Sequence, residues 1–242
     1  MIQVDKIVKQ FGSIHAVDDI SFSVGKGEVL GFLGPNGAGK STTMKILTCF
    51  LQPDSGSAKV GGCDILEDPV GVRRKVGYVP ENVPLYEDMS VGSFLRFVCD
   101  VRGIKGQDAV SAIDRVVEQC NIVSVYHQVM ETLSKGYKRR VGLAQAFLHD
   151  PEILILDEPT DGLDPNQKHD VRKMISGMAE DKCIIISTHI LEEVDAVCNR
   201  AIIIAHGKVL ADGTPKELSE RGNGRLDVYF RELTRPQEGH AA

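Results

Sequence analysis

The segment VLGFLGPNGAGKST, residues 29–42, decides the fold class. It opens with the apolar run Val29 to Leu33, passes through a glycine-rich stretch and ends in Lys-Ser-Thr. A short, continuous apolar run is typical of a strand that is buried on both faces of a parallel sheet. The glycines predict a tight loop, and a helix is expected to begin near Gly39. The segment therefore predicts a strand, a loop and a helix in direct succession.

Residues 34–41 of this segment match the pattern G-x-x-x-x-G-K-[ST] in its proper context. In such a loop the backbone N–H groups face inward and hold phosphate oxygens, and the helix N-terminus adds partial positive charge. Lys40 is expected to reach the β- and γ-phosphates, and the hydroxyl of Ser41 to bind Mg²⁺. The residues expected around the nucleotide phosphates are Gly34, Pro35, Asn36, Gly37, Ala38, Gly39, Lys40, Ser41 and Thr42.

Two adjacent carboxylates, Asp157 and Glu158, follow a second apolar run at residues 153–156. Neighbouring side chains on a strand point to opposite faces, so one carboxylate can serve a metal and the other a water molecule. We assign Asp157 to Mg²⁺ through a coordinated water, and Glu158 to the general base that polarises the attacking water.

A histidine, His189, follows a third apolar strand at residues 183–186. In open α/β sheets, ligands bind beyond the carboxyl ends of the strands, so strands that end near Gly34, Glu158 and His189 point to one site. We expect His189 to contact the γ-phosphate and the water, which makes it catalytic together with Lys40 and Glu158. The other six histidines are interpreted as surface or core residues.

The remaining pattern predicts an α/β fold with a mainly parallel sheet, because strands alternate with helices after residue 150. Short strands separated by glycines precede residue 34, and residues 90–149 have helical periodicity. Alternating apolar residues near the C-terminus, Leu226, Val228 and Phe230, fit either a short strand or the remnant of a longer tail. Residues 236–242 read as a loose tail.

The composition is that of an ordinary globular chain: 242 residues, 42% hydrophobic, 26% charged, with a net charge of −6. This composition argues against disorder and against binding of nucleic acid through bulk charge. No apolar run approaches the roughly 18 residues of a membrane-spanning helix, and the N-terminus lacks the features of a secretory signal. The six cysteines are scattered, which favours a reducing, cytosolic setting over a disulfide framework or zinc site.

With these motifs the sequence resembles the ATP-binding subunit of ABC transporters, over nearly the whole chain from Ile2 to about Leu218. Residues 133–137, LSKGY, are similar to the family's LSGGQ signature, and residues 161–164, DGLD, to its D-loop. Residues 79–81, VPE, are similar to the Q-loop, and Phe11 to the aromatic residue that stacks on adenine. The order of these motifs with the phosphate loop, the carboxylate pair and the histidine is highly specific.

The resemblance implies a P-loop NTPase fold of the ABC ATPase kind, with an antiparallel N-terminal β subdomain and an inserted helical subdomain. It implies ATP and Mg²⁺ as cofactors, with Ser41, Glu81 and Asp157 near the metal. In the family two chains sandwich two ATP molecules, so Ser134 and Gly136 would bind the ATP held by the opposite subunit. Asp164 would help to join the two subunits.

Three departures from the common family pattern stand out. Glu81 replaces the Q-loop glutamine, Lys135 and Tyr137 replace residues of the signature, and Asp161-Gly162 replaces the usual Ser-Ala pair. The combination looks most like the exporter branch that includes multidrug, sodium-extrusion and gliding-motility ATPases.

The resulting interpretation is an exporter subunit that couples ATP-driven dimer closure to the movement of polytopic membrane subunits, with no nucleic-acid partner. The second ATPase subunit would be either an identical or a different chain. We expect an ABC ATPase domain over residues 1–222, with the helical subdomain at about 88–148, and a partly disordered extension over 223–242. The protein would lie on the cytoplasmic face of the membrane. A helix of the membrane subunit would dock on residues 82–97, which contain the exposed-looking Val83, Leu85, Tyr86 and Met89. The alternatives are packing of these residues within the helical subdomain, and a soluble ABC-type ATPase that serves cofactor or complex assembly.

Overall fold

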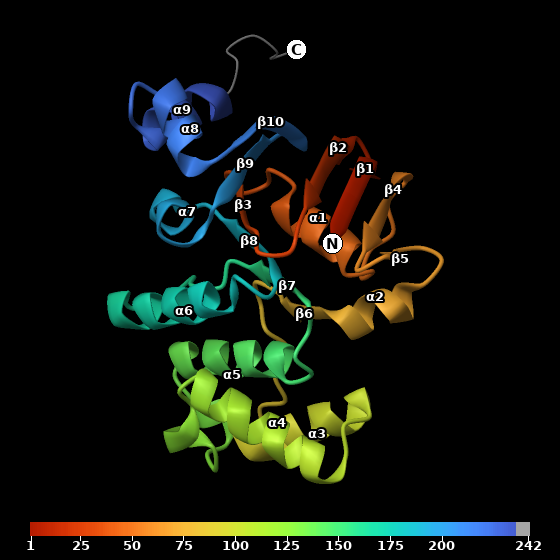
Figure 1. The fold of residues 1–242 in the computed structure, drawn as a ribbon, viewed down its shortest axis with the longest axis vertical. Coiled ribbons are helices and arrows are strands. Elements are labelled where there is room, and N and C mark those ends of the chain that lie inside the picture. The colour runs from red at the N-terminus through yellow and green to blue at the C-terminus, as the bar shows by residue number, and fades with distance from the viewer. Residues whose placement is uncertain (236–242) are drawn as a thin grey trace.

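A six-stranded sheet forms the centre of the computed structural model, which describes residues 1–235 (Figure 1). Its strand order is β10-β9-β3-β8-β7-β6, and every neighbouring pair is parallel except β10 and β9. The strands are β3 (Val29–Leu33), β6 (Val76–Val79), β7 (Ile153–Asp157), β8 (Cys183–Thr188), β9 (Arg200–Ala205) and β10 (Lys208–Gly213). The prediction of a mainly parallel α/β sheet is confirmed.

The apolar runs of the sequence are explained by burial on both faces of this sheet. In β7, Ile153 and Ile155 belong to the hydrophobic cluster on one face, and Leu154 and Leu156 to the cluster on the other. All five residues of β7 are buried. A strand covered on both sides cannot show the polar-apolar alternation of a surface strand, so its sequence is continuously apolar.

A second, antiparallel sheet has the order β2-β1-β4-β5. It contains β1 (Ile2–Phe11), β2 (Ile14–Val24), β4 (Ser55–Val60) and β5 (Cys63–Asp64). Its inward side chains, such as Ile7 and Ile20, share one hydrophobic cluster with the central sheet and with Met44 on the first helix. The expected N-terminal β layer is therefore present, with β1 and β2 longer than the sequence pattern predicts.

Helices cover the central sheet and form a separate group between β6 and β7 in the sequence (Figure 1). In chain order the helices are α1 (Lys40–Leu47), α2 (Pro69–Lys75), α3 (Val91–Arg102), α4 (Gly106–Gln119), α5 (Lys135–Phe147), α6 (Pro165–Met178), α7 (Leu191–Val197), α8 (Pro215–Arg221) and α9 (Leu226–Thr234). Two short 3-10 helices, Val123–Val125 and Met130–Thr132, precede α5. None of the helices within residues 1–235 combines the length and apolar character needed to cross a bilayer.

The C-terminal region corrects one expectation. The apolar residues after Gly224 form the helix α9 and not a short strand. Leu226 is buried and Tyr229, Phe230 and Leu233 pack against the same core cluster, which is the i, i+3, i+4, i+7 spacing of a helix face. Val228, which suggested alternation, is on the exposed side. The tail at residues 236–242 lies outside the described residues.

The segment 82–97 also differs from expectation. Val83, Leu85 and Met89 are partly buried against the core cluster and are not free surface residues. Tyr86 remains exposed and stacks edge-on against the exposed ring of Phe97, with centroids 5.4 Å apart. Most of the apolar character of this segment therefore serves packing within the helical group.

Candidate nucleotide site

The phosphate loop connects β3 to α1, as the sequence predicts. Gly39 precedes α1 with a backbone φ of +102°, and a Cβ atom there would lie 2.1 Å from the carbonyl oxygen of Ala16. Both the conformation and the close approach therefore require glycine. No side chain caps the N-terminus of α1, and its first turn contains no acidic residue. This helix end can accept an anion.

Lys40 folds back over the loop and is buried. Its Nζ donates hydrogen bonds to the carbonyl oxygens of Gly34, at 2.8 Å, and Pro35, at 3.1 Å, and lies 3.7 Å from Oε1 of Glu158. Burial lowers the pKa of Lys40 from its ordinary value, while the charges of Glu158 and Asp157 act in the opposite direction. An arriving phosphate would add negative charge beside this ammonium and would favour its protonated form.

Asp157 and Glu158 diverge, for a different reason from the one inferred from strand geometry. β7 ends at Asp157, and Glu158 has left the strand with a φ of +50°. Asp157 is buried and accepts a hydrogen bond from the hydroxyl of Ser187. Glu158 turns toward Lys40 and His189, with its Oε1 3.1 Å from Nδ1 of His189. The prediction that the two carboxylates serve different neighbours fits this geometry. Their side chains diverge because the backbone of Glu158 is left-handed, and not because the two residues alternate along a strand.

An open cleft of about 730 Å³ brings most of the predicted residues together. The N-terminal sheet contributes Phe11, whose ring is about half exposed with Nζ of Lys9 5.6 Å from its centroid. The remaining lining consists of Ile14, Ala16, Asn36, Gly37, Ala38, Gly39, Lys40, Ser41, Thr42, Glu81, Glu158, Asp161 and His189. An aromatic ring at one side and a cationic loop at the other match a nucleotide with its base and its phosphates.

A second cavity, of about 430 Å³, shares Ser41 and Glu81 with this cleft and is also lined by Asp157. A hydroxyl and two carboxylates are the oxygen ligands that Mg²⁺ prefers. The buried hydroxyl of Tyr78 lines the same cavity without a hydrogen-bond partner, and burial raises its pKa. Because Mg²⁺ retains several waters, a hydrated ion would give this hydroxyl a partner. Within residues 1–235 no three His, Cys, Asp or Glu side chains form a metal cluster. A Mg²⁺ ion in this cavity would therefore need the hydroxyl of Ser41 as a ligand besides the two carboxylates.

The signature residues lie elsewhere. Ser134 caps α5 and accepts a hydrogen bond from the backbone N–H of Tyr137 at 3.4 Å, and Gly136 is buried in the first turn. Neither residue is among the described residues that line the cleft of the phosphate loop. Asp164, from the D-loop, caps α6 through the N–H of Gln167. One chain therefore does not bring its own signature to its own phosphate loop.

Two of the three sequence departures meet in space. Nζ of Lys135, in the signature, lies 3.2 Å from a carboxylate oxygen of Asp161, in the D-loop. Both side chains are substantially exposed, so this ion pair contributes little to stability. The two unusual residues nevertheless complement each other in charge.

Residues 17–161 match the family described as ABC transporter. The chain belongs to the ABC transporter family. Among curated ABC proteins, it is 37% identical over 219 residues to the probable multidrug ABC transporter ATP-binding protein YbhF of Escherichia coli K12. It is 36% identical over 225 residues to the linearmycin resistance ATP-binding protein LnrL of Bacillus subtilis 168.

The extent of these matches differs. The alignment covers 90% of this chain but only 38% of YbhF, so the chain spans well under half of that relative, whereas it covers 93% of this chain and 72% of LnrL. A solved structure described as the ATP binding subunit of an ABC transporter superposes with a TM-score of 0.88 at 28% identity, covering 97% of this chain and all of that one. The expected ABC ATPase fold is confirmed.

Two residues of the site were not predicted from the sequence. The hydroxyl of Ser187 donates a hydrogen bond to Asp157, and the guanidinium of Arg139 donates to the backbone carbonyl oxygens of Asp157 and Glu158. For Arg139 a signal existed: it shares a helix face with Leu143 and Ala146, at i, i+4 and i+7, which places an arginine on the buried side. For Ser187 no local signal existed, because its partner is 30 residues away.

Proposed function

We propose that the chain is the ATP-binding and ATP-hydrolysing subunit of an ABC exporter. The observation that carries the proposal is the convergence of Lys40, Glu158 and His189, from three separate segments, at one cleft with Phe11 on its wall. Relatives that are named for multidrug transport and linearmycin resistance support an export role.

In the proposed reaction, Phe11 stacks on adenine and residues 34–42 hold the phosphates. Lys40 exchanges a carbonyl partner for a phosphate oxygen and neutralises charge that develops during transfer. Glu158 accepts a proton from the attacking water, and His189 fixes the direction of that carboxylate. We propose Ser41, Asp157 and Glu81 as the residues that hold Mg²⁺ directly or through water; bound there, the ion would neutralise phosphate charge.

We further propose that two ATPase chains work together. Ser134 and Gly136 lie outside the chain's own cleft, and the N-terminus of α5 is the kind of end that binds an anion. A second subunit, identical or different, would bring this helix end to the ATP of the first. ATP that binds the closed dimer more tightly than the open one can then drive a conformational cycle.

The cycle would act on polytopic membrane subunits, which place this chain on the cytoplasmic face of the membrane. The exposed pair Tyr86 and Phe97 supports contact with such a partner. We retain the division into an ATPase domain at 1–222, with a helical subdomain at about 88–148, and an extension at 223–242 as part of the proposal.

The deciding experiment expresses the chain together with the products of its neighbouring genes, tests whether it co-purifies with a polytopic protein, and measures ATP hydrolysis in the membrane fraction. Co-purification from the membrane, with ATP hydrolysis that Lys40→Ala removes, is expected. A stable complex found only in the soluble fraction would instead support the assembly-type ATPase.

A further inference from the structure

Arg139 is a buried arginine in the second turn of α5, two residues after Tyr137, the last residue of the signature. Its guanidinium donates hydrogen bonds to five main-chain carbonyl oxygens, from Pro80, Glu81, Asp157, Glu158 and Pro159. Three acceptors are the last residue of β7 and the two residues that follow it, and the other two belong to the segment that follows β6. One side chain thus ties the helix of the signature to both acidic segments of the nucleotide site.

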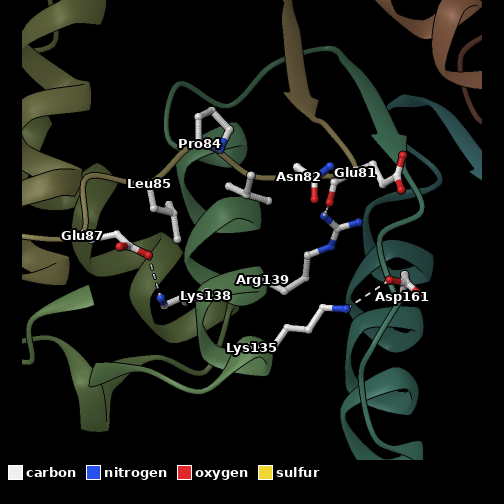
Figure 2. Close-up of a pocket in the computed structure, with 10 residues that line it drawn as sticks. Glu81, Asn82, Pro84, Leu85, Glu87, Lys135, Lys138, Arg139 and Asp161 are labelled. Carbon is white, nitrogen blue, oxygen red and sulfur yellow. Dashed lines mark hydrogen bonds and ion pairs between the residues drawn. The ribbon is translucent and has the colours of Figure 1, made fainter. Parts of the chain in front are cut away.

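Four of the five bonds have ordinary hydrogen-bond lengths. Nη1 lies 2.9 Å from the oxygen of Pro80 and 2.8 Å from that of Glu81, and Nη2 lies 2.7 Å from that of Asp157. Nε lies 3.1 Å from the oxygen of Pro159. Figure 2 shows the Arg139 guanidinium extending from its helix toward Glu81 and Asn82, on the wall of a cavity of about 410 Å³.

The bond to Glu158 matters most, because the backbone of Glu158 is in the left-handed region, with a φ of +50°. For a non-glycine residue this conformation is strained and persists only when its surroundings hold it. Here the N–H of Glu158 donates to the carbonyl oxygen of Ser187 at 3.0 Å. Its carbonyl oxygen accepts from Arg139 and from the N–H of Asp161. Both sides of the unusual residue are therefore fixed.

The charge of Arg139 suits this position. Burial lowers the pKa of the guanidinium, while Asp157, Asp161, Glu158 and Glu81 act in the opposite direction. An arginine keeps its charge in proteins, so it also supplies a positive charge behind a site that gathers carboxylates. Its planar fork can reach several acceptors at once, which a lysine ammonium on a flexible stem cannot do in the same way.

We propose that Arg139 is a positioning residue for ATP hydrolysis, which holds the Glu158 backbone in the conformation that points its carboxylate at Lys40 and His189 and ties it to Glu81. The inference rests on the proposed function, since it gives Arg139 a part in the same reaction. Arg139 is not among the described residues that line the cleft of the phosphate loop, and it acts through the backbone of Glu81 and Glu158, which do line it.

The first test compares Arg139→Lys and Arg139→Gln with a matched control, Arg140→Lys, in the transporter complex. Arg140 is the next residue of α5, is also buried and bonds to Asp170 on α6. We expect kcat for ATP to fall by about 10- to 100-fold in both Arg139 variants, because small displacements of a catalytic group have effects of that size. KM for ATP should stay within about threefold, since the phosphate loop is untouched. A kcat of Arg139→Lys equal to that of the control would overturn the inference.

The second test needs no ATPase activity. Hydrogen exchange of the nucleotide-free full chain should show faster exchange, by about tenfold or more, at the amides of Glu158 and Asp161 in Arg139→Lys, while β3 amides stay as protected as in Arg140→Lys. Unchanged exchange at these two amides would contradict the inference, and loss of protection throughout the chain would assign Arg139 to folding alone. If the wild-type complex hydrolysed no ATP, the proposed function would fail, and this exchange test would still decide whether Arg139 holds Glu158.

Discussion

Nδ1 of His189 lies 3.1 Å from Oε1 of Glu158, although the two residues are 31 positions apart in the sequence. The same carboxylate oxygen lies 3.7 Å from Nζ of Lys40. Glu158 therefore stands between the group proposed to neutralise phosphate charge and the group proposed to orient the carboxylate.

Glu158→Gln tests the assignment of the general base. The amide keeps the size of the side chain but cannot take the proton from water, so hydrolysis should fall by about 10²–10⁴-fold while ATP binding remains. The variant should also accumulate as a closed dimer in ATP, which gel filtration with and without nucleotide would show. A turnover rate equal to wild type would refute the assignment.

Lys40→Ala tests the phosphate loop. It removes a buried ammonium that faces Glu158 and, in the proposal, the phosphates, so ATP affinity should fall by about 100-fold, the loss typical of a buried charged partner. Equilibrium binding of a fluorescent ATP analogue measures this directly. Lys26→Ala is the control, because Lys26 is exposed and forms its ion pair with an exposed residue, Asp181. Low-micromolar affinity retained in Lys40→Ala would count against the proposed role.

Glu81→Gln tests the unusual acidic residue in the Q-loop position. Removal of one carboxylate from the proposed metal site should raise the Mg²⁺ concentration for half-maximal hydrolysis by about tenfold. Titration of MgCl₂ at saturating ATP measures the shift, and EDTA should abolish hydrolysis in both proteins. Glu87→Gln, in the same segment but paired with Lys138, should match wild type. An unaltered Mg²⁺ requirement in Glu81→Gln would remove Glu81 from the metal site.

The lowered pKa of His149 is expected to make the free energy of unfolding depend on pH. Burial, and next the charge of Arg102, lower its pKa to about 4. Its Nε2 lies 3.0 Å from Nη1 of Arg102. The unfolded chain therefore binds a proton from about pH 6.5 downward, where the folded chain does not. The contribution of His149 to the free energy of unfolding is full above pH 6.5 and is lost as the pH falls toward 4.

His149→Gln should flatten this dependence. Urea unfolding midpoints between pH 4 and 7 would show a smaller loss of stability on acidification than in wild type. His169→Gln, on the exposed side of α6, is the matched histidine control. Parallel curves for wild type and His149→Gln would show that other groups cause the acid sensitivity.

Local sequence determined the parts of the fold and site that depend on neighbouring residues. The phosphate loop could be predicted because one strand, its glycines and the start of α1 lie within residues 29–47, and Gly39 needs a conformation that other residues avoid. The helices α6 and α7 alternate with strands after residue 150, as the sequence pattern predicts. The C-terminal helix α9 was missed because its residues also alternate, and only packing against the core distinguishes the two periods.

Only the tertiary structure decided how the acidic groups are aimed. The left-handed conformation of Glu158 depends on Ser187 and Arg139, which come from β8 and α5. Likewise, burial of Val83, Leu85 and Met89 depends on helices that follow later in the chain. Sequence fixes which groups are available at the strand ends, because burial and turn chemistry are local. Their directions result from hydrogen bonds between distant segments, and these exist only once the chain has folded.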